Sequence, residues 1–559
     1  MPVYAQAPPH GQDQPSIDNA EVAEPADIDA KGDPEEGADG VYEEEMGILI
    51  TDIVFSGNKV ISTQALREIT APYRGQAMTL QEMGELTDLI TMTYQEKGYI
   101  LARAYLPEQE IAKGVLEVSI AEGNVGKIIV VGQKHFSPGV IKKYFSDQEK
   151  LGVIREDLLE KGILFSNEVP QVKTDLVLKE GEKTGDVDVV INAKEVSSVT
   201  FGIDASLDYN NYGSERVGAD RYGVTLDMVD HRLGTKFRFK GVTGDYYDRS
   251  RLISMQLTAP VFDFGSEITG SYFNGTTFLK NEVQQATVRY VIPTDSVVEN
   301  VGIQYRQPII KKRNMSLDVI AGYQKKSFKL FYDNDAVQSN RIDDREILFG
   351  RLSFENLDRY LGRNFANFEY HRGELESEYL RSGGGKDDLH TRSDADSQFW
   401  KIFAQAGRIQ KIYGPTNLMV RGSAQYTEDR LVQTEQTAIG GYWTVRGHPV
   451  SSVLGDSGYT VTTEVISAPP YLSDKVIFGQ RIGQLVQIMG FFDHGGVYNN
   501  DWETQTSETY AEYLSGAGVG FRLYYKDLFT FKYSLAFPID EPGNDNNHVH
   551  YFEGTYKFF

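Results

Sequence analysis

Apolar and polar residues alternate with a period of two along most of the chain after position 197, where no helical repeat is found. Around 486–493, Val486, Ile488 and Phe492 fall on one side of the segment, whereas Gln487 and Asp493 fall on the other. Sixteen candidate strands of this kind occur between 197 and 559. At roughly 10 residues for each tilted membrane-spanning strand, they leave ample length for long loops.

Strands with one apolar and one polar face are typical of a barrel wall that separates lipid from water. Closure is required, because an open sheet edge in lipid would leave backbone groups unpaired at a cost of several kcal/mol each. We therefore predict a transmembrane antiparallel β-barrel of about 16 strands over 197–559. Asp493 would face its aqueous lumen.

Residues 47–125 and 126–196 show a different pattern, in which helical periods stand between short strands. In 47–125, a strand leads into two helices and then into two strands joined by a turn at Lys113-Gly114. Ser62 is placed to cap the first helix. The predicted apolar face of the second helix consists of Leu80, Met83, Leu86, Leu89, Ile90 and Tyr94. Residues 126–196 repeat the theme with a strand, helices and a hairpin.

The two α/β units follow each other without a linker rich in Pro, Gly or Ser, so we expect a semi-rigid arm. A small sheet with two helices on one face leaves a strand edge exposed. Such an edge can bind an extended peptide through backbone hydrogen bonds, with little demand on sequence. Gly98 follows the second helix, at a position where glycine commonly ends a helix.

Composition narrows the possible classes of protein. No run of 18 apolar residues occurs in the 559 residues, so no membrane-spanning helix is predicted. The 33 Tyr, 29 Phe and 54 Gly suit a strand-rich protein with aromatic girdles at the membrane interfaces. The absence of Cys excludes disulfides and thiolate metal sites. A formal net charge of −24 argues against nucleic acid as a partner.

Residues 1–46 are predicted to be an acidic, disordered N-terminal segment, which could serve as a plug or a linker. Lys31 is its one basic residue among many Asp and Glu, and any helix is interrupted by Pro8, Pro9, Pro15, Pro25 and Pro34. The start, MPVYAQA, resembles the end of a secretory signal, but the apolar core of a signal peptide is apparently absent from this chain.

Candidate catalytic residues do not form a recognisable set. The glycines at 383–385 lack a following helix that would make a phosphate site, and no serine lies in a nucleophile elbow. His548 and His550 are two apart on one strand, a spacing that could bind a metal with further ligands, or they are polar lumenal or loop residues. We predict no catalytic residue, no metal site, no cofactor and no enzyme activity.

Two stretches near the C-terminal end have an unusual composition. GGYWTVRGHP lies in a long Gly-punctuated loop near 430–457 and carries Arg446 close to its tip. FFDHGG follows at the end of a strand and carries Asp493. The simplest partner for a lumenal carboxylate is an arginine on a loop long enough to fold back into the barrel.

TVRGHP and FFDHGG resemble the two signature motifs of the two-partner secretion transporters (TpsB proteins, haemolysin secretion/activation type) and of the wider superfamily of POTRA-bearing outer-membrane barrels. The resemblance implies that Arg446 pairs with Asp493 inside the barrel and locks the loop to the wall. The residues that support the two motifs are Val445, Gly447, His448, Phe491 and Gly495. The family more often has Tyr or Phe where this chain has His448.

The α/β units are similar to TpsB-type POTRA domains, and two such units is the number expected for that family. The resemblance rests on KGY at the end of the second helix and on YLPEQEI, so the POTRA motif comprises Gly98, Tyr99, Leu106 and Pro107. The alternating aromatics before the terminal Phe559 resemble the signal by which outer-membrane barrels are recognised for assembly.

The resemblance implies an outer-membrane pore whose POTRA domains lie in the periplasm. They would recognise a large unfolded TpsA-type exoprotein, such as an adhesin, a haemolysin or a contact-dependent toxin, and the pore would translocate it without ATP. Outer-membrane lipid and the barrel-assembly machinery would be further partners. A barrel-assembly factor of the same superfamily, and a simple porin, remain alternatives.

Overall fold

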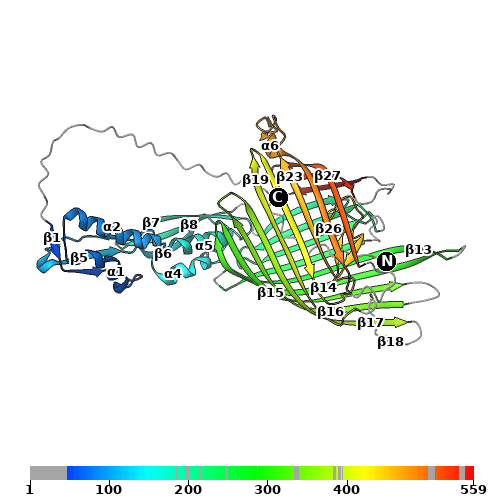
Figure 1. Ribbon diagram of the computed structural model, residues 1–559, viewed down its shortest axis with the longest axis horizontal. Coiled ribbons are helices and arrows are strands. Elements are labelled where there is room, and N and C mark those ends of the chain that lie inside the picture. Colours follow the sequence, from blue (N-terminus) through cyan, green and yellow to red (C-terminus); the bar gives the residue numbers. More distant parts are fainter. Residues whose placement is uncertain are drawn as a thin grey trace.

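The computed structural model describes residues 47–183, 185–195, 201–214, 217–245, 250–262, 265–285, 288–332, 339–381, 386–387, 392, 395–500, 510–539 and 548–558. They form two small α/β domains, placed one after the other, and a large barrel (Figure 1). None of the helices among these residues has the length and apolar character needed to cross a membrane.

The first α/β domain contains β1 (Ile48–Ile50), β2 (Asp52–Ser56), α1 (Thr63–Thr70), η1 (Ala71–Tyr73), β3 (Gln76–Met78), α2 (Leu80–Glu96), β4 (Arg103–Tyr105), η2 (Ala112–Gly114) and β5 (Val115–Ala121). Its main sheet has the order β2-β5-β4, with β2 and β4 at the edges. Leu66, Ile90 and Leu116 are fully buried between helices and sheet.

Local capping explains where the helices of this domain begin. The Ser62 hydroxyl accepts a hydrogen bond of 3.3 Å from the Ala65 amide at the start of α1. Thr79 and Glu82 cap each other at the start of α2. Leu80, predicted to lie on the buried face of α2, is 71% exposed. Periodicity predicts the direction in which a side chain points around a helix. It does not predict that the first turn of α2, which contains Leu80, extends beyond the part of the domain that the helix packs against.

The second α/β domain contains β6 (Asn124–Val131), α3 (Pro138–Lys142), η3 (Lys143–Phe145), α4 (Ser146–Leu151), α5 (Glu156–Ser166), β7 (Val172–Glu180) and β8 (Asp186–Glu195). Its sheet has the order β6-β8-β7, which matches the β2-β5-β4 arrangement of the first domain with one parallel and one antiparallel pair. The repetition of this order confirms the prediction of two similar α/β units.

Sixteen strands close the barrel: β9 (Phe201–Asn210), β10 (Arg221–Asp230), β11 (Lys236–Gly244), β12 (Ser250–Val261), β13 (Ser266–Gln285), β14 (Val288–Lys312), β15 (Met315–Tyr332), β16 (Ser339–Leu357), β17 (Arg363–Arg381), β19 (Gln398–Tyr413), β20 (Thr416–Tyr426), β23 (Ser457–Ser467), β26 (Val486–Tyr498), β27 (Ala511–Tyr525), β28 (Phe529–Pro538) and β29 (Val549–Lys557). The short elements between them are β18 (Lys386–Asp387), β21 (Thr437–Ile439), β22 (Val453–Gly455), β24 (Val476–Ile477), β25 (Gln480–Arg481) and α6 (Ile482–Leu485).

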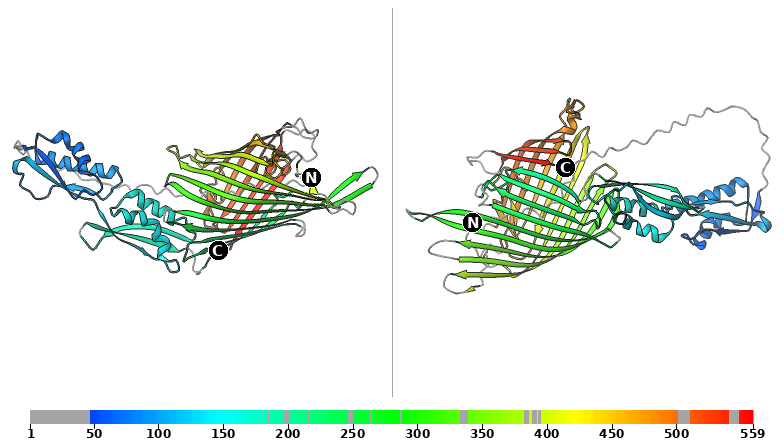
Figure 2. Two further views of the ribbon diagram at one scale, coloured as in Figure 1. Left: turned by 90° about the horizontal axis from the view of Figure 1, so that it is seen from below. Right: turned by 180° about the vertical axis from the view of Figure 1, so that it is seen from behind.

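All neighbouring barrel strands are antiparallel, and β29 pairs with β9 from Glu553↔Asn210 to Lys557↔Ser206 to close the ring. The predicted closed barrel of about 16 strands is confirmed. The strands from β13 to β17 are longer than predicted, and β14 has 25 residues. They extend beyond the rest of the barrel at the end away from the α/β domains (Figure 2). An antiparallel ladder can continue past the membrane, where water replaces lipid on its outer face.

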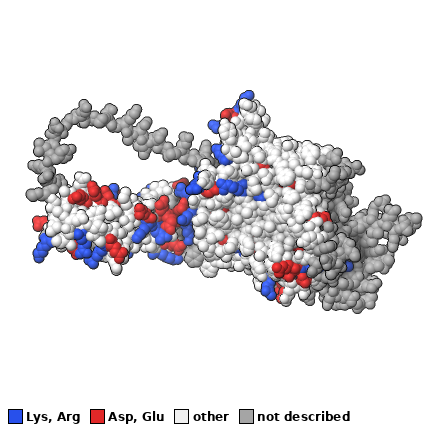
Figure 3. All heavy atoms as spheres, in the orientation of Figure 1, with Lys and Arg blue, Asp and Glu red and all other residues white. Residues whose placement is uncertain are grey.

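The two faces of the wall are identified by the residues of β16. Ile347 is fully buried against Phe399 and against Leu431, which belongs to a loop inside the barrel. The adjacent Leu348 is 62% exposed and therefore faces outward. On the face shown in Figure 3, charged side chains gather over the α/β domains and at their junction with the barrel, whereas most of the wall is uncharged. An uncharged outer wall suits contact with lipid.

The second α/β domain is joined to the barrel by charged groups. The Glu168 carboxylate contacts Arg306 of β14 at 3.2 Å and Lys311 of the same strand. Burial by itself raises the pKa of Glu168, but the two cations outweigh it and hold that pKa below its ordinary value. Phe165 of α5 packs closely against Gly265, which lies between β12 and β13. A Cβ atom at position 265 would lie 2.5 Å from the Phe165 ring. These contacts fix the arm to the rim of the barrel.

Candidate functional site in the barrel lumen

The loop between β20 and β23, residues 427–456, folds back into the barrel. Its hairpin β21–β22 leads to a tip in which Gly440, Gly441 and Gly447 have φ values of 105°, 92° and 96°. A Cβ at Gly447 would lie 2.8 Å from the backbone nitrogen of Pro538, so only glycine fits there without displacement. Val445 is fully buried near the wall residue Val497.

Arg446 occupies the centre of the site. Its Nε donates to Asp493 Oδ2 at 2.6 Å and its Nη2 donates to Asp493 Oδ1 at 2.9 Å. Its Nη1 donates to Glu464 Oε1 of β23 at 2.8 Å, and its Cζ lies 3.5 Å from the centre of the Phe491 ring. Its side chain is 3% exposed. The structure thus brings together the two residues that the motifs predicted to pair, and places Phe491 under the guanidinium.

The other residues of the two motifs surround this pair. The Gly447 amide donates to the Tyr551 hydroxyl of β29 at 3.2 Å. His448 Nε2 donates to the Ser515 carbonyl of β27 at 2.8 Å, so the side chain that replaces the family's usual aromatic makes a polar contact. A Cβ at Gly495 would lie 3.1 Å from Val445, which explains the small residue at that point of β26.

Two charged residues of the site were missed by sequence analysis. Glu464 contacts Arg446, and its second oxygen accepts from Arg522 of β27 at 2.7 Å. Glu464 and Arg522 both lie on the lumenal faces of predicted strands. A charged residue on such a face is the sequence signal by which they could have been predicted. Their proximity to Arg446 depends on how β23, β26 and β27 are aligned, which the sequence pattern does not reveal.

A second buried cluster, also unforeseen, lies at the base of the same loop. The Glu435 carboxylate contacts Lys326 of β15 at 3.1 Å, Arg345 of β16 at 2.8 Å and Lys401 of β19 at 2.9 Å. The Glu435 side chain is fully buried. The loop is therefore attached to two separate groups of wall strands.

The predicted POTRA motif lies far from the lumen, in the first α/β domain. Gly98 has a φ of 87° just after α2, and Tyr99 packs edge-on against Tyr94 at 6.0 Å between ring centres. Leu106 packs against the core of the domain, and Pro107 follows β4. Residues 1–46, which could form a plug or a linker, and Phe559, the predicted assembly signal, lie outside the described residues.

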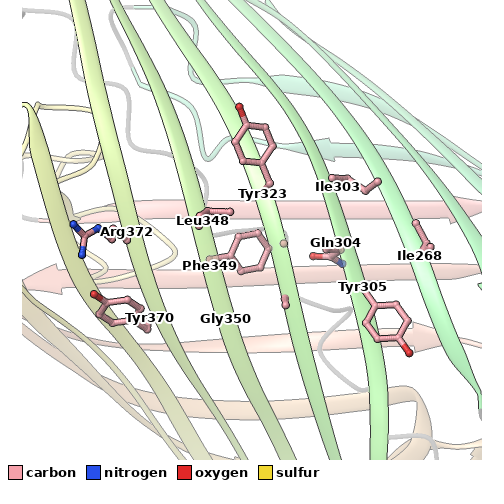
Figure 4. A pocket seen from close by; sticks show the side chains of 12 residues that line it. Ile268, Ile303, Gln304, Tyr305, Tyr323, Leu348, Phe349, Gly350, Tyr370 and Arg372 are labelled. Carbon is pink, nitrogen blue, oxygen red and sulfur yellow. The ribbon is translucent and has the colours of Figure 1, made fainter.

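Two remaining features lie apart from the loop. Across the part of the chain that the structure describes, no three His, Cys, Asp or Glu residues are placed to hold a metal ion. A hollow of about 600 Å³ on the wall is lined by residues that include Ile303, Leu348 and Tyr370 (Figure 4). Leu348 faces outward, so this hollow opens toward lipid and is separate from the lumenal site.

Residues 185–523 match the family described as "Haemolysin secretion/activation protein ShlB/FhaC/HecB", and residues 48–123 match "POTRA domain, ShlB-type". The chain belongs to this secretion family. Its members are two-partner secretion transporters of the outer membrane, and the POTRA domains of such a transporter lie in the periplasm.

The transporter is similar to curated and solved relatives along most of its length. It is 24% identical to the heme/hemopexin transporter protein HuxB of Haemophilus influenzae (strain 86-028NP), over 91% of this chain and 87% of that protein. It is 22% identical to the outer membrane transporter CdiB of Escherichia coli O6:K15:H31 (strain 536 / UPEC), over 74% of this chain and 68% of that protein. The structure of CdiB from Escherichia coli has the same fold, with a TM-score of 0.72 at 17% identity over 94% of this chain and 93% of that one.

Proposed function

We propose that this transporter exports one large, unfolded TpsA-type partner through its lumen, and that the loop bearing Arg446 closes the resting pore. The observation that carries the proposal is the buried contact of Arg446 with Asp493 and Glu464, which holds a long loop inside the channel. A simple porin has no need of such a loop or of a periplasmic arm.

The POTRA arm is proposed to receive the partner first. In the first domain the edge strands of the main sheet are β2 and β4, and in the second they are β6 and β7. Edge strands can add an extended peptide through backbone hydrogen bonds without recognising a particular sequence. Residues 47–125 and 126–196 would thus form the receiving arm and residues 197–559 the channel.

The lumen is proposed to carry the partner as an extended chain or hairpin, because a sixteen-stranded barrel leaves an aqueous channel. Folding of the partner outside the cell would supply the direction without ATP, since a folded chain cannot slide back. Adhesins, haemolysins and contact-dependent toxins are the classes of partner that suit a member of this family.

The proposal is tested by deleting the gene in its host and comparing exported protein with the content of other outer-membrane barrels. We expect one large protein to disappear from the surface or the medium while the other barrels keep their abundance. A general fall in barrel content would instead identify an assembly factor. An unchanged set of exported proteins would exclude export altogether.

A further inference from the structure

The base and the tip of the lumenal loop both lie against β26, but their charged contacts are with different strands. The loop base, residues 430–439 and 453–456, contacts β15, β16 and β19 through Glu435. The loop tip, residues 441–450, contacts β23 and β26 through Arg446. Around the ring, β20 lies between β19 of the first group and β23 of the second, so these charged contacts attach base and tip to neighbouring sectors of the wall.

The base is bound by more than one carboxylate. Besides its three ion pairs, Glu435 accepts hydrogen bonds at its backbone oxygen from Lys401 Nζ at 3.0 Å and from Gln425 Nε2 at 3.1 Å. At the other end of the base, the fully buried Asp456 accepts from Arg392 at 2.5 Å and from the Asn500 amide at 2.9 Å. The base is therefore held at both ends, by wall strands at Glu435 and, at Asp456, by residues that lie just outside the strands.

Charge balance makes the base much harder to move than the tip. If Glu435 left its place, Lys326, Arg345 and Lys401 would face one another in a buried site without that carboxylate, and like charges repel strongly where water is excluded. If Arg446 left its place, Glu464 would keep Arg522 at 2.7 Å. Only Asp493 would then lose its arginine, and a lumen that admits water could hydrate it.

Backbone conformation places a pivot between the two parts. Gly440 and Gly441 both have positive φ values, and a Cβ at Gly440 would lie 2.3 Å from the Pro449 carbonyl oxygen. The Ser451 amide donates to the Gly440 carbonyl at 3.2 Å, which closes the tip into a compact unit. A unit closed at its neck can turn as one body about the glycines.

We infer that Glu435 is a positioning residue that keeps the loop base fixed to the wall during secretion, and that the pore opens by movement of the tip alone. This inference rests on the proposed function, in which the loop closes the resting pore. It specifies which part of the loop leaves its place. The cluster around Glu435 holds the base still while the tip turns about the glycines.

One wall residue allows base and tip to be tested against each other. A Cβ at Gly495 of β26 would lie 3.4 Å from Cγ2 of Ile439, in the base, and 3.1 Å from Cγ2 of Val445, in the tip. Each Cγ2 atom is bonded to the Cβ of its residue, so both Cβ atoms lie near the range of about 3.5–4.5 Å that separates the Cβ atoms of a disulfide. The chain contains no Cys, so each introduced pair is the only pair that can form.

The experiment compares Ile439→Cys/Gly495→Cys with Val445→Cys/Gly495→Cys in cells, and scores export after oxidation against export by the same variant after reduction. We expect the base disulfide to leave this ratio near one and the tip disulfide to lower it at least tenfold. A block by the base disulfide, or full export with the tip disulfide, would overturn the inference. Each variant thus serves as its own reference. If the wild-type protein itself exported no partner under reducing conditions, that result would count against the proposed function instead.

A second measurement tests the positioning role of Glu435 if the cysteine variants fail to assemble. Glu435→Gln keeps the side-chain length and removes the charge, so we expect its resting conductance in planar bilayers to rise severalfold while Arg446 and Asp493 are unaltered. Glu428→Gln is the matched control, because Glu428 is an exposed glutamate of the same loop. Resting conductance equal to that of the control would contradict a positioning role for Glu435.

Discussion

Arg446 donates hydrogen bonds to three carboxylate oxygens of two residues, and its guanidinium carbon also lies over the Phe491 ring. A planar guanidinium can make all of these contacts at once, whereas an ammonium group cannot. An exposed ion pair contributes about 0–1 kcal/mol, but breaking a buried one costs about 3–5 kcal/mol. Arg446 is nearly completely buried but lies in a lumen that can admit water, so the cost of breaking its pair is expected to fall between these two values.

Arg446→Ala is expected to leave the barrel folded and to lower export of the partner at least tenfold. The barrel is held by backbone hydrogen bonds between strands, which this change does not touch, whereas the loop loses its contact with Asp493. Folding is measured by the mobility of the unheated protein on a gel, and export by immunoblot of the medium. Arg359→Ala, in an exposed turn between β16 and β17, is the control, and wild-type export by Arg446→Ala would contradict the proposed role.

At the scale of elements, the end of β8 is fastened to the segment that follows β6. The Glu195 carboxylate accepts hydrogen bonds from the backbone amides of Lys134, His135 and Phe136 at 2.7, 2.8 and 2.9 Å. The Phe136 ring lies 4.0 Å, centre to centre, from His231, in the turn between β10 and β11. The carboxylate therefore shapes the segment through which the POTRA arm contacts the barrel.

Acid should loosen this segment. Burial raises the pKa of Glu195, but the three amides and His135 outweigh it and hold the pKa at about 2, below the ordinary 4.5. A depressed pKa means that the stabilisation is complete above the ordinary value and is lost as pH falls toward 2. We expect Glu195→Gln to lower the hydrogen-exchange protection of these amides at pH 7. Near pH 2 the substitution should lower that protection less, because Glu195 is then partly protonated. Glu182→Gln, in an exposed pair with Lys127, is the control, and equal protection in both variants at pH 7 would contradict the expectation.

At the scale of the whole molecule, the first POTRA domain and the barrel are separate folding units joined through the second POTRA domain. The described joint includes the contacts of α5 and Glu168 with β14 of the barrel and that of Phe136 with His231. The barrel closes through its own strands, from β9 to β29. The arm can therefore be shortened without opening the ring.

Removal of residues 47–123 is expected to leave a closed barrel in the outer membrane and to abolish export. The barrel keeps all its strand pairs, but the edge strands β2 and β4 that are proposed to receive the partner are lost. Barrel content is measured in isolated membranes and export in the medium. Undiminished export by the shortened transporter would show that the first domain does not receive the partner.

Several features could be predicted because they depend on neighbours in the chain. Alternation along each strand identified all sixteen barrel strands, and the motifs indicated the contact between Arg446 and Asp493. The length of β14 was underestimated, because alternation does not distinguish a strand in lipid from its continuation in water. The prediction that Leu80 is buried was wrong, because helix periodicity predicts where a side chain points but not how far it lies from the sheet.

Period-two alternation, helix periodicity and glycine-rich loops are local properties, so the closed barrel, the α/β arm and the loop arginine could be predicted from the amino-acid sequence. Which charges meet in the lumen depends on the folded arrangement of distant segments. Glu464 and Glu435 reach their partners through strand register and through the path of a loop, which bring together residues as distant in the chain as Lys326 and Glu435. Such contacts depend on closure of the whole ring, and no local pattern encodes them.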